Sequence, residues 1–391
     1  MHMSRRLASV SATALLLALA PAAHAGCGLG DLDGNGTVDG ADLGMLLASW
    51  GRGGAGDLDA NGTIDGADLG IMLASWGPTT LECGGFPPQW ISGAPNCSTE
   101  PPIQVHWYNE NLAILRQSLC TNFEGPFIML LFGQDKVLMM DTGAGNISLA
   151  PKVQEVVADW LADHEQDSIE LVVAHTHGHG DHVAGNAQFV NLPNTVLVGN
   201  SQTAVKTFFG ITNWPDQIVE YDLGGRIVDI IPIPGHQSAH IAVYDRATGL
   251  LLTGDTLYPG RLYISSFAQY MDSIDRLVAF TADKPVCWVL GTHIEMSNTP
   301  GDDFPVGSIS HPDEHPLQLT KAHLLELQAA IHAMAEAPHY EVHDDFIIFP
   351  LGGAAGGARS DAGGAASGGE DDARCCARPQ NMFELGRLMA Q

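Results

Sequence analysis

Basic residues are scarce in this chain of 391 residues. Lysine and arginine together number 17, against 45 aspartates and glutamates, which gives a formal net charge of −28 at pH 7. A protein that binds nucleic acid needs a basic surface to displace the counterions of the phosphates. We therefore expect no nucleic-acid partner. A small-molecule substrate is compatible with this composition.

Long apolar runs are also missing. The apolar stretch 14–20 is too short to cross a bilayer. It follows Arg5 and Arg6, and it precedes residues 23–25, Ala-His-Ala, which have the form of a cleavage site. We expect residues 1–25 to be a signal peptide and the protein to be secreted, to an extracellular or periplasmic location. We expect no transmembrane segment.

The seven cysteines include no pair with the spacing of a zinc ribbon. In an exported protein some of them should form disulfides, and an odd count leaves at least one cysteine without a partner in the chain. Cys27 and Cys83 flank the repeat described next and could join its ends. The sequence does not assign the other pairs.

A near-identical repeat occupies residues 26–82. Residues 30–51 read GDLDGNGTVDGADLGMLLASWG, and residues 56–77 read GDLDANGTIDGADLGIMLASWG. Each copy fits a calcium loop of about twelve residues that leads into a helix, with oxygen ligands at regular positions. Oxygen-only donor sets suit calcium. The expected calcium ligands are Asp31, Asp33, Asn35, Thr37, Asp39 and Asp42 in the first loop, and Asp57, Asp59, Asn61, Thr63, Asp65 and Asp68 in the second.

The helix after each loop has one apolar face. Leu43, Leu46, Leu47 and Trp50 share a face in the first copy and correspond to Leu69, Met72, Leu73 and Trp76 in the second, so we expect the two helices to pack on each other. The pair of loops resembles a type I dockerin module. This resemblance implies a small all-α, EF-hand-type domain over 26–82 with two bound calcium ions and a cohesin-type scaffold protein as partner. A calcium-stabilised module without a cohesin partner is the alternative.

The rest of the chain divides into three parts. Residues 83–102 are rich in proline, glycine and serine and are expected to be a linker. Residues 103–350 mix short apolar runs, such as 127–132, 136–140 and 169–174, with segments of helical spacing, such as 153–164. This mixture predicts an α/β (α+β) domain with two sheets covered by helices. Residues 351–391 are expected to be a Gly/Ala-rich flexible tail with a short helix.

The candidate chemistry follows the apolar run 169–174. Residues 175–182 read HTHGHGDH, which places His177, His179, Asp181 and His182 within six positions. Imidazole and carboxylate ligands suit zinc, and also iron or manganese. We expect Gly178 and Gly180 to let the backbone turn sharply enough for the four side chains to converge.

Further ligand-type residues follow other expected strands. His236 follows the run 227–233, Asp255 follows 250–252, and His293 follows 286–290. Together with the motif at 177–182, this set resembles the metallo-β-lactamase superfamily, an αββα sandwich with metals at one edge of its sheets. The resemblance implies that His177, His179 and His236 bind one metal, that Asp181, His182 and His293 bind a second, and that Asp255 bridges them. It also implies that Asp141 and His240 support these ligands.

The resemblance implies a binuclear zinc hydrolase that uses a metal-bridging hydroxide to cleave an ester, lactone, thioester or amide, with Asp181 moving the proton. Penicillin-cleaving members generally have Cys or Ser where this chain has Asp255, whereas PGHQSAH at 234–240 and LLTGDTLYPGR at 251–261 are similar to the glyoxalase II and lactonase branches. A persulfide-dioxygenase-like iron oxidoreductase, a phosphodiesterase and an inactive core serving as a binding module remain alternatives. We expect Trp107, Trp214, Tyr258 and Tyr263 to line the substrate pocket.

Overall fold

The computed structural model describes residues 30–32, 37–54, 56–59, 61–78, 81, 84–93 and 97–351. The expected signal peptide, the tail from residue 352, Asp33, Asn35, Cys27 and Cys83 lie outside these residues. None of the helices in the described part of the chain combines the length and the apolarity that a bilayer crossing requires.

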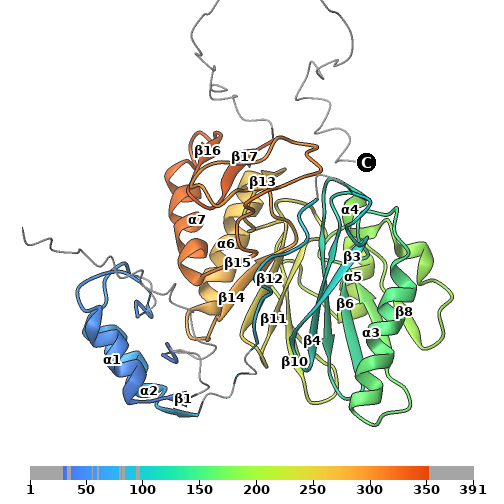
Figure 1. Ribbon diagram of the computed structural model, residues 1–391. Helices are drawn as coiled ribbons and strands as arrows, with labels where there is room; N and C mark the ends of the chain where they lie inside the picture. The colour runs from blue at the N-terminus through green and yellow to red at the C-terminus, as the bar shows by residue number, and fades with distance from the viewer. Residues whose placement is uncertain are drawn as a thin grey trace, which may run out of the picture.

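Two six-stranded sheets form the centre of the catalytic domain (Figure 1). The first sheet has the order β3-β4-β5-β6-β7-β8, with antiparallel pairing up to β6 and parallel pairing from β6 to β8. Its strands are β3 (Ile103–Asn109), β4 (Leu112–Gln117), β5 (Phe127–Phe132), β6 (Lys136–Met140), β7 (Glu170–Ala174) and β8 (Thr195–Leu197).

The second sheet has the order β15-β14-β12-β11-β10-β9, and within it β12 and β14 run parallel. Its strands are β9 (Val219–Asp222), β10 (Ile227–Pro232), β11 (Ile241–Asp245), β12 (Leu250–Gly254), β14 (Trp288–Gly291) and β15 (Gln318–Leu319). A smaller sheet, β13-β17-β16, adds β13 (Arg261–Ile264), β16 (Glu341–Val342) and β17 (Ile347–Pro350).

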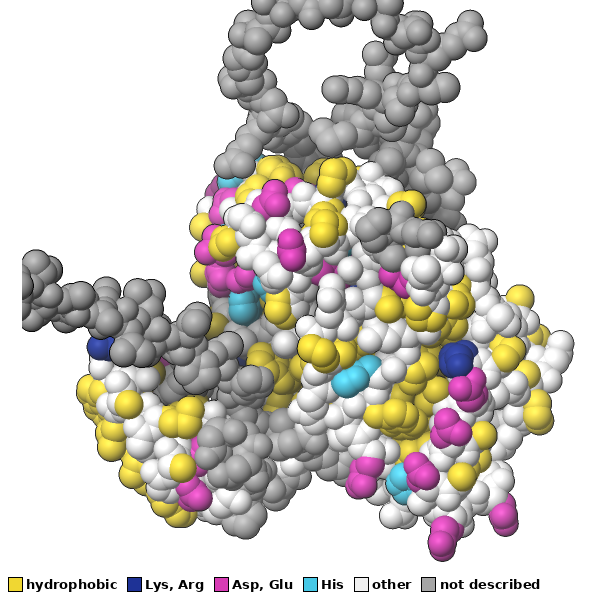
Figure 2. Space-filling model, viewed as in Figure 1, with side chains coloured by type: hydrophobic (Ala, Val, Ile, Leu, Met, Phe, Trp, Pro, Cys, Tyr) yellow, Lys and Arg dark blue, Asp and Glu magenta, His cyan; other side chains and the backbone are white. Residues whose placement is uncertain are grey.

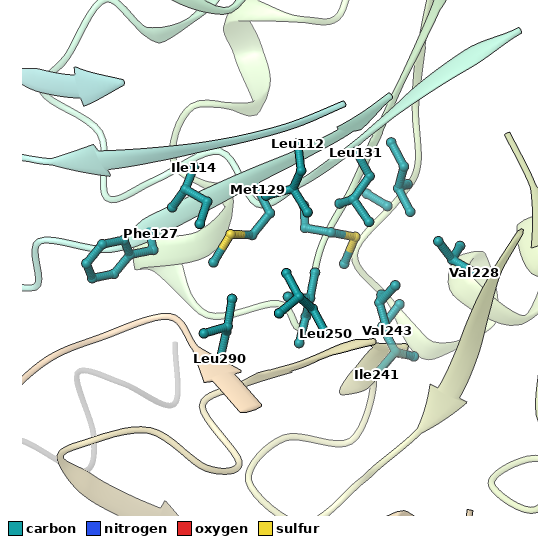
Figure 3. Close-up of a cluster of buried hydrophobic side chains, with 14 of the residues drawn as sticks. Leu112, Ile114, Phe127, Met129, Leu131, Val228, Ile241, Val243, Leu250 and Leu290 are labelled. Carbon is teal, nitrogen blue, oxygen red and sulfur yellow. The ribbon is translucent and has the colours of Figure 1, made fainter. Parts of the chain in front are cut away.

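Successive side chains of a strand point to opposite faces of its sheet, and this alternation explains how each sheet packs between two layers. In β5, Phe127, Met129 and Leu131 face the second sheet, in the core that also contains Leu250 and Leu290 (Figure 3). The intervening residues Ile128, Leu130 and Phe132 face helix α3 (Leu149–Asp163). Because both faces of this strand are buried, its sequence is continuously apolar.

Helices cover the outer faces of both sheets. Val153, Val156 and Trp160 of α3 pack on the first sheet, at the spacing that places them on one helical face. Helices α6 (Phe267–Thr281) and α7 (Lys321–Ala333) pack on the second sheet. The remaining helices of this domain are α4 (Gly180–Val183), the 3₁₀ turn Asn186–Gln188 and α5 (Gln202–Phe209). The expected αββα sandwich is confirmed.

The segment that precedes β3 lies against this sandwich. Trp90 is buried, and its ring contacts the Phe127 ring edge to face at a centroid distance of 4.9 Å. Cys97 and Cys120 form a disulfide that ties the same segment to the loop after β4. Cys287 is buried in β-sheet surroundings with its thiol reduced. The described part of the expected linker therefore contributes to the core of the catalytic domain.

The N-terminal module contains α1 (Gly40–Ala48) and α2 (Gly66–Ala74), with a two-stranded ladder between β1 (Thr37–Val38) and β2 (Gly77–Pro78). Leu46 and Met72 are fully buried between the helices, as expected. Leu43 and Leu69 also pack against this core, as expected. For the outer part of the apolar face the expectation was wrong, because Leu47, Trp50, Leu73 and Trp76 are 45–53% exposed. Figure 2 shows hydrophobic side chains, in yellow, on the outer surface of the module. Each helix buries only a narrow stripe of residues, and none of the described residues covers the remaining apolar side chains.

Candidate metal centre

The candidate ligands lie at one edge of the two sheets. His177 follows β7, His236 follows β10, Asp255 follows β12 and His293 follows β14. The strands β12 and β14 are parallel, and β10 has the same direction because it is two antiparallel steps from β12. The carboxyl ends of these strands therefore meet at the same edge, and the ligand-type side chains meet there too.

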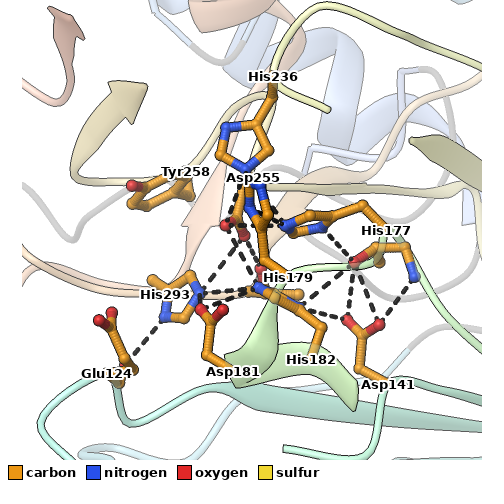
Figure 4. A network of polar contacts seen from close by, with 12 residues as sticks. Glu124, Asp141, His177, His179, Asp181, His182, His236, Asp255, Tyr258 and His293 are labelled. Atoms are coloured by element: carbon orange, nitrogen blue, oxygen red, sulfur yellow. Dashed lines mark hydrogen bonds and ion pairs between the residues drawn. The ribbon is translucent and has the colours of Figure 1, made fainter. Parts of the chain in front are cut away.

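The first group consists of His177, His179 and His236. The Nδ1 atom of His179 lies 2.9 Å from Nε2 of His177 and 3.0 Å from Nε2 of His236 (Figure 4). The two Nε2 atoms of His177 and His236 are 3.2 Å apart. Three imidazole nitrogens thus face a common point, with the ring of His179 turned so that its Nδ1 points inward.

The second group consists of Asp181, His182, Asp255 and His293. The Oδ2 atom of Asp181 lies 3.1 Å from Nε2 of His182 and 3.3 Å from Nε2 of His293. Asp255 lies between the groups, since its Oδ2 is 3.3 Å from His182 Nε2 and 3.6 Å from His177 Nε2. The structure brings the seven predicted side chains together, with Asp255 at the shared position.

Hydrogen bonds on the outer side of the rings fix which nitrogen faces the centre. The Nδ1–H of His236 donates to the carbonyl of Tyr263 at 2.6 Å, and the Nδ1–H of His293 donates to the carbonyl of Glu124 at 2.9 Å. The Nδ1–H of His182 donates to Asp141 at 3.0 Å. A ring that donates through Nδ1 has its lone pair on Nε2 when it is neutral. The inward nitrogens are therefore free to act as ligands.

These inward lone pairs fit a pair of cations. Nitrogens that face each other at 2.9–3.3 Å with lone pairs on both sides repel unless a positive charge lies between them. Histidine with carboxylate, in two groups that share one carboxylate, is a donor set that suits zinc. The residues present thus fit two metal ions, one in each group.

The pKa values of the histidines differ between the two groups, because the carboxylates Asp181 and Asp255 lie closer to the histidines of the second group. Burial, together with neighbouring His236, lowers the pKa of His179 to about 4. Burial alone would lower the pKa of His293, but Asp255 and Asp181 raise it to about 10. A metal bound in the second group must compete with that proton, so its uptake should release protons.

Asp141 supports the centre from the end of β6. Its carboxylate accepts hydrogen bonds from the backbone N–H of Thr176 at 2.8 Å, from the Thr176 hydroxyl at 2.9 Å and from His182. Asp141 has a φ of 72°, a left-handed conformation that costs a non-glycine residue free energy. The side chain is fully buried, so this strain is balanced by the hydrogen bonds it makes.

Replacing Asp141 by asparagine should weaken metal binding in the second group by roughly 10–100-fold, because the amide cannot accept all of these hydrogen bonds and His182 loses its orientation. Competition against a chromogenic chelator measures the affinity. Asp135→Asn, an exposed position before the same strand, is the matched control. Wild-type affinity for both metals in Asp141→Asn would show that Asp141 does not position His182.

His240, the other expected supporting residue, stacks on His177 at a ring-centroid distance of 4.7 Å. Its Nε2 is buried, and no atom of the described residues forms a hydrogen bond with it; burial holds the pKa of His240 well below the usual range. It contacts His177 as a neutral ring and belongs to neither group of candidate ligands. His175 also stays outside the two groups, and its Nε2 is bonded to Asn186 at 2.7 Å.

The four side chains of the motif converge without a left-handed glycine, because neither Gly178 nor Gly180 has a positive φ. Gly178 lies in a tight place, since a Cβ there would be 3.1 Å from the carbonyl oxygen of Asn200. Gly235 is the glycine that needs its conformation, with a φ of 146°, and a Cβ there would lie 2.4 Å from Cα of Tyr270. This close approach positions His236 against α6.

Several contacts at the centre were not predicted. Glu124 and Tyr263 act through backbone carbonyls, which have no side-chain signature in a sequence. Thr292 donates from its hydroxyl to Asp255. Among the four expected pocket residues, Tyr258 lies beside His293 at 5.6 Å and Tyr263 lines a pocket. Trp107 and Trp214 instead pack at the margins of the hydrophobic core.

Residues 122–293, which contain all seven candidate ligands, match the family model described as the metallo-beta-lactamase superfamily. The domain has the metallo-β-lactamase fold. Solved structures similar to it include a metallo-beta-lactamase from Pontibacter korlensis, with 16% identity, a TM-score of 0.40, and coverage of 59% of this chain and 99% of that one. Another, from Hirschia baltica, has 17% identity, a TM-score of 0.37, and coverage of 49% and 91%.

Curated relatives of this metallo-β-lactamase domain include hydroxyacylglutathione hydrolases. The protein of Aeromonas salmonicida is 32% identical over 165 residues, which are 41% of this chain and 59% of the relative. A protein of a Synechococcus species is 33% identical over 137 residues, which are 32% and 51%. The chain spans between half and three-fifths of the length of these relatives.

Proposed function

We propose that this chain is a secreted, metal-dependent hydrolase with two zinc ions that cleaves an ester, lactone, thioester or amide. The observation that carries the proposal is the position of Asp255, whose Oδ2 lies 3.3–3.6 Å from ligand-type nitrogens of both groups. A carboxylate at that point can contact two metals at once. The similarity to hydroxyacylglutathione hydrolases supports a carbonyl substrate.

When bound, two zinc ions would lower the pKa of a water molecule between them and polarise the substrate oxygen. The chain's own residues would orient the reaction. Asp181 is the one carboxylate of the centre with substantial solvent access, at 22% side-chain exposure, against 8% for Asp255. Its Oδ2 is therefore placed to accept a proton from the attacking water and to return it to the leaving group.

Tyr258, whose ring lies beside His293, is not available as an acid. Its hydroxyl donates to the carbonyl of Arg261, and burial, together with Glu295, holds its pKa well above the usual range. The hydroxyl of Thr292 is likewise committed to Asp255. Among the described residues of the centre, Asp181 is thus the best-placed group for proton transfer.

The test is hydrolysis of a panel of chromogenic esters, lactones, thioesters, amides and phosphodiesters, together with metal analysis. We expect two metal ions per chain, turnover of a carbonyl substrate, loss of turnover in a strong chelator and recovery on adding zinc. One iron per chain with consumption of oxygen would instead favour a persulfide-dioxygenase-like oxidoreductase. Turnover of phosphodiesters alone would favour a phosphodiesterase.

We also propose that the second loop of the N-terminal module binds calcium. Asp57, Asp59 and Asp68 converge there, and Gly62 supplies a φ of 90° at the turn. Backbone N–H groups of Leu58 and Asp59 orient Asp68, at 2.6 and 3.1 Å. In the first loop, Asp42 accepts from Leu32 in the same way, at 2.7 Å. Cohesin docking of this module stays a prediction.

Titration calorimetry of the zinc-loaded full chain should show uptake of calcium at two sites. Asp68→Asn should remove one of them, because the final ligand of the loop loses its charge. Asp163→Asn, at the end of α3 in the catalytic domain, should leave both. Two unchanged sites in Asp68→Asn would contradict the assignment of this loop.

The disulfide between Cys97 and Cys120 supports export, since such bonds persist in oxidising compartments. Secretion, to an extracellular or periplasmic location, is therefore part of the proposal, and fractionation of the producing cell tests it.

A further inference from the structure

The two oxygens of the Asp255 carboxylate have different surroundings. Its Oδ2 lies 3.3 Å from Nε2 of His182 in the second group, and 3.5 and 3.6 Å from Nε2 of His236 and His177 in the first. Its Oδ1 lies 3.4 Å from Nε2 of His293, which belongs to the second group. The oxygen that faces both groups is therefore Oδ2, and Oδ1 lies on the side of the second group.

The hydroxyl of Thr292 donates a hydrogen bond to this Oδ1. Among the described residues, and apart from the ligand-type histidines, Thr292 is the only one that donates to the Asp255 carboxylate. Thr292 and Asp255 are 4% and 6% exposed, so bulk water has little access to replace the hydroxyl. A hydrogen bond to an ionised carboxylate is stronger than one between neutral groups. The bond therefore restricts rotation of the carboxylate about its Cβ–Cγ bond.

The backbone of Thr292 is held where the two sheets meet. Its carbonyl accepts a hydrogen bond from the N–H of Phe127 in β5 at 2.8 Å, and its N–H donates to the carbonyl of Gly254 in β12 at 3.3 Å. Thr292 also follows β14 directly. A β-branched side chain has few accessible rotamers. The hydroxyl thus extends from a residue that contacts strands of both sheets, and a group supported in this way can hold its partner in one orientation.

Other ligands of the centre have supports of the same kind. The Nδ1–H groups of His182, His236 and His293 donate to oxygen atoms on the outer sides of the rings. Thr292 holds the corresponding place for Asp255, the carboxylate that the two groups share. Loss of such an outer hydrogen bond typically weakens metal binding by roughly 10–100-fold. The support of the shared carboxylate affects how the two metal sites are linked, whereas each of the other supports acts on one group.

We propose that Thr292 is a positioning residue whose hydroxyl holds Asp255 so that a single oxygen, Oδ2, is shared by the two metals. Without the hydroxyl, Oδ1 would be free to bind the second metal, because it already lies 3.4 Å from Nε2 of His293. The carboxylate would then turn both oxygens towards the second group, and the first group would keep its three histidines alone. The inference rests on the proposed hydrolase function with two zinc ions, and it names the residue on which the pairing of the metals depends.

The test measures the zinc affinity of the full chain by competition against a chromogenic chelator. Thr292→Val removes the hydroxyl and keeps the β-branched shape, and it should weaken the binding of one of the two zinc ions by roughly 10–100-fold while the other stays close to the wild-type value. Thr292→Ser keeps a hydroxyl and should retain most of the wild-type affinity. Wild-type affinity for both ions in Thr292→Val, or equal weakening in the valine and serine variants, would overturn the proposal.

A matched control separates positioning from folding. Thr281 is buried as well, and its hydroxyl donates to the carbonyl of Leu277 within α6. Thr281→Val should therefore lower the midpoint of denaturant unfolding of the metal-free protein about as much as Thr292→Val does, but it should leave both zinc affinities unchanged. If Thr281→Val weakened zinc binding as strongly, the effect of Thr292→Val would reflect general destabilisation, and the proposal would be wrong.

A second background identifies the affected metal. His179→Ala removes one histidine of the first group, so the ion that this variant retains should be that of the second group. Adding Thr292→Val to His179→Ala should leave the affinity for the remaining ion nearly unchanged. A further loss of about tenfold or more would show that Thr292 supports the second metal itself, and it would contradict the proposed sharing through Oδ2.

These binding measurements need no turnover, so they are independent of the proposed function. Selective loss of one zinc ion in Thr292→Val, with no hydrolysis of any compound in the panel by the wild-type protein, would refute the hydrolase and keep the role of Thr292. Hydrolysis by the wild-type protein, together with unchanged zinc affinities in Thr292→Val, would refute that role and keep the hydrolase.

Discussion

Replacing His179 by alanine is expected to lower kcat/KM on the substrate found in the panel by roughly 10³-fold, since a metal in a hydrolase supplies several kcal/mol to the transition state. His179 provides the Nδ1 that lies 2.9 and 3.0 Å from the nitrogens of His177 and His236. Its removal leaves two histidines, which is too few to hold the first metal firmly. Metal analysis should fall from two ions towards one.

The matched control is His332→Ala, which removes an imidazole from the exposed side of α7, where it bonds to Asp275. This variant should keep both metals and wild-type rates. A fully active His179→Ala protein would show that the three-histidine group is not part of the catalytic machinery. Loss of activity with both metals retained would assign His179 a role in the reaction other than binding metal.

Glu314→Gln should lower the free energy of unfolding by about 3 kcal/mol, because it leaves the buried Arg116 guanidinium without its counter-charge. The Arg116 side chain is fully buried and Glu314 is 7% exposed. Both terminal nitrogens of Arg116 bond to this carboxylate, one of them at 2.6 Å, and His311 donates to it at 3.1 Å. The pair joins β4 to the loop that precedes β15, so its loss affects the whole domain.

Denaturant unfolding followed by circular dichroism measures the change. Glu220→Gln breaks the exposed pair between Arg246 and Glu220, where the side chains are 39% and 63% accessible, and should cost less than about 1 kcal/mol. The double variant Arg116→Met with Glu314→Leu should recover much of the lost stability by burying apolar groups instead. If Glu314→Gln and Glu220→Gln lowered the free energy of unfolding by similarly small amounts, the buried ion pair would contribute little to the stability of the fold.

The sequence predicted the parts of the fold in which one physical signal dominates. Strand β5 is apolar at every position because both its faces are buried, so its limits at Phe127 and Phe132 agree with the prediction. The ligand-type residues were also predicted, because each follows an apolar run and brings a metal-binding group. Their position at one edge of the sheets was implied by the resemblance to the metallo-β-lactamase superfamily, and the shared direction of β10, β12 and β14 explains it in the structure.

Other elements carry weaker signals. In strand β3 only Ile103 and Tyr108 are buried and the other residues are half-exposed, so the strand has no clear alternation of apolar and polar positions. Trp90 lies in a segment rich in proline and glycine, yet it is buried against Phe127 by contacts that only the tertiary fold creates. The carbonyl groups of Glu124 and Tyr263 are present in any sequence, and only the folded geometry reveals that they orient ligands.

The chain order of the seven ligand side chains has a consequence for assembly. His177, His179, Asp181 and His182 are close neighbours in the chain, whereas His236, Asp255 and His293 arrive from the other sheet. A chain in which only the first sheet has formed has only part of the ligand set in place, so it should bind zinc weakly. Tight zinc uptake should therefore appear late in refolding, after contacts of large sequence separation have formed. With cobalt in place of zinc, the rise of the ligand-field absorption during refolding would report when the two sheets dock against each other.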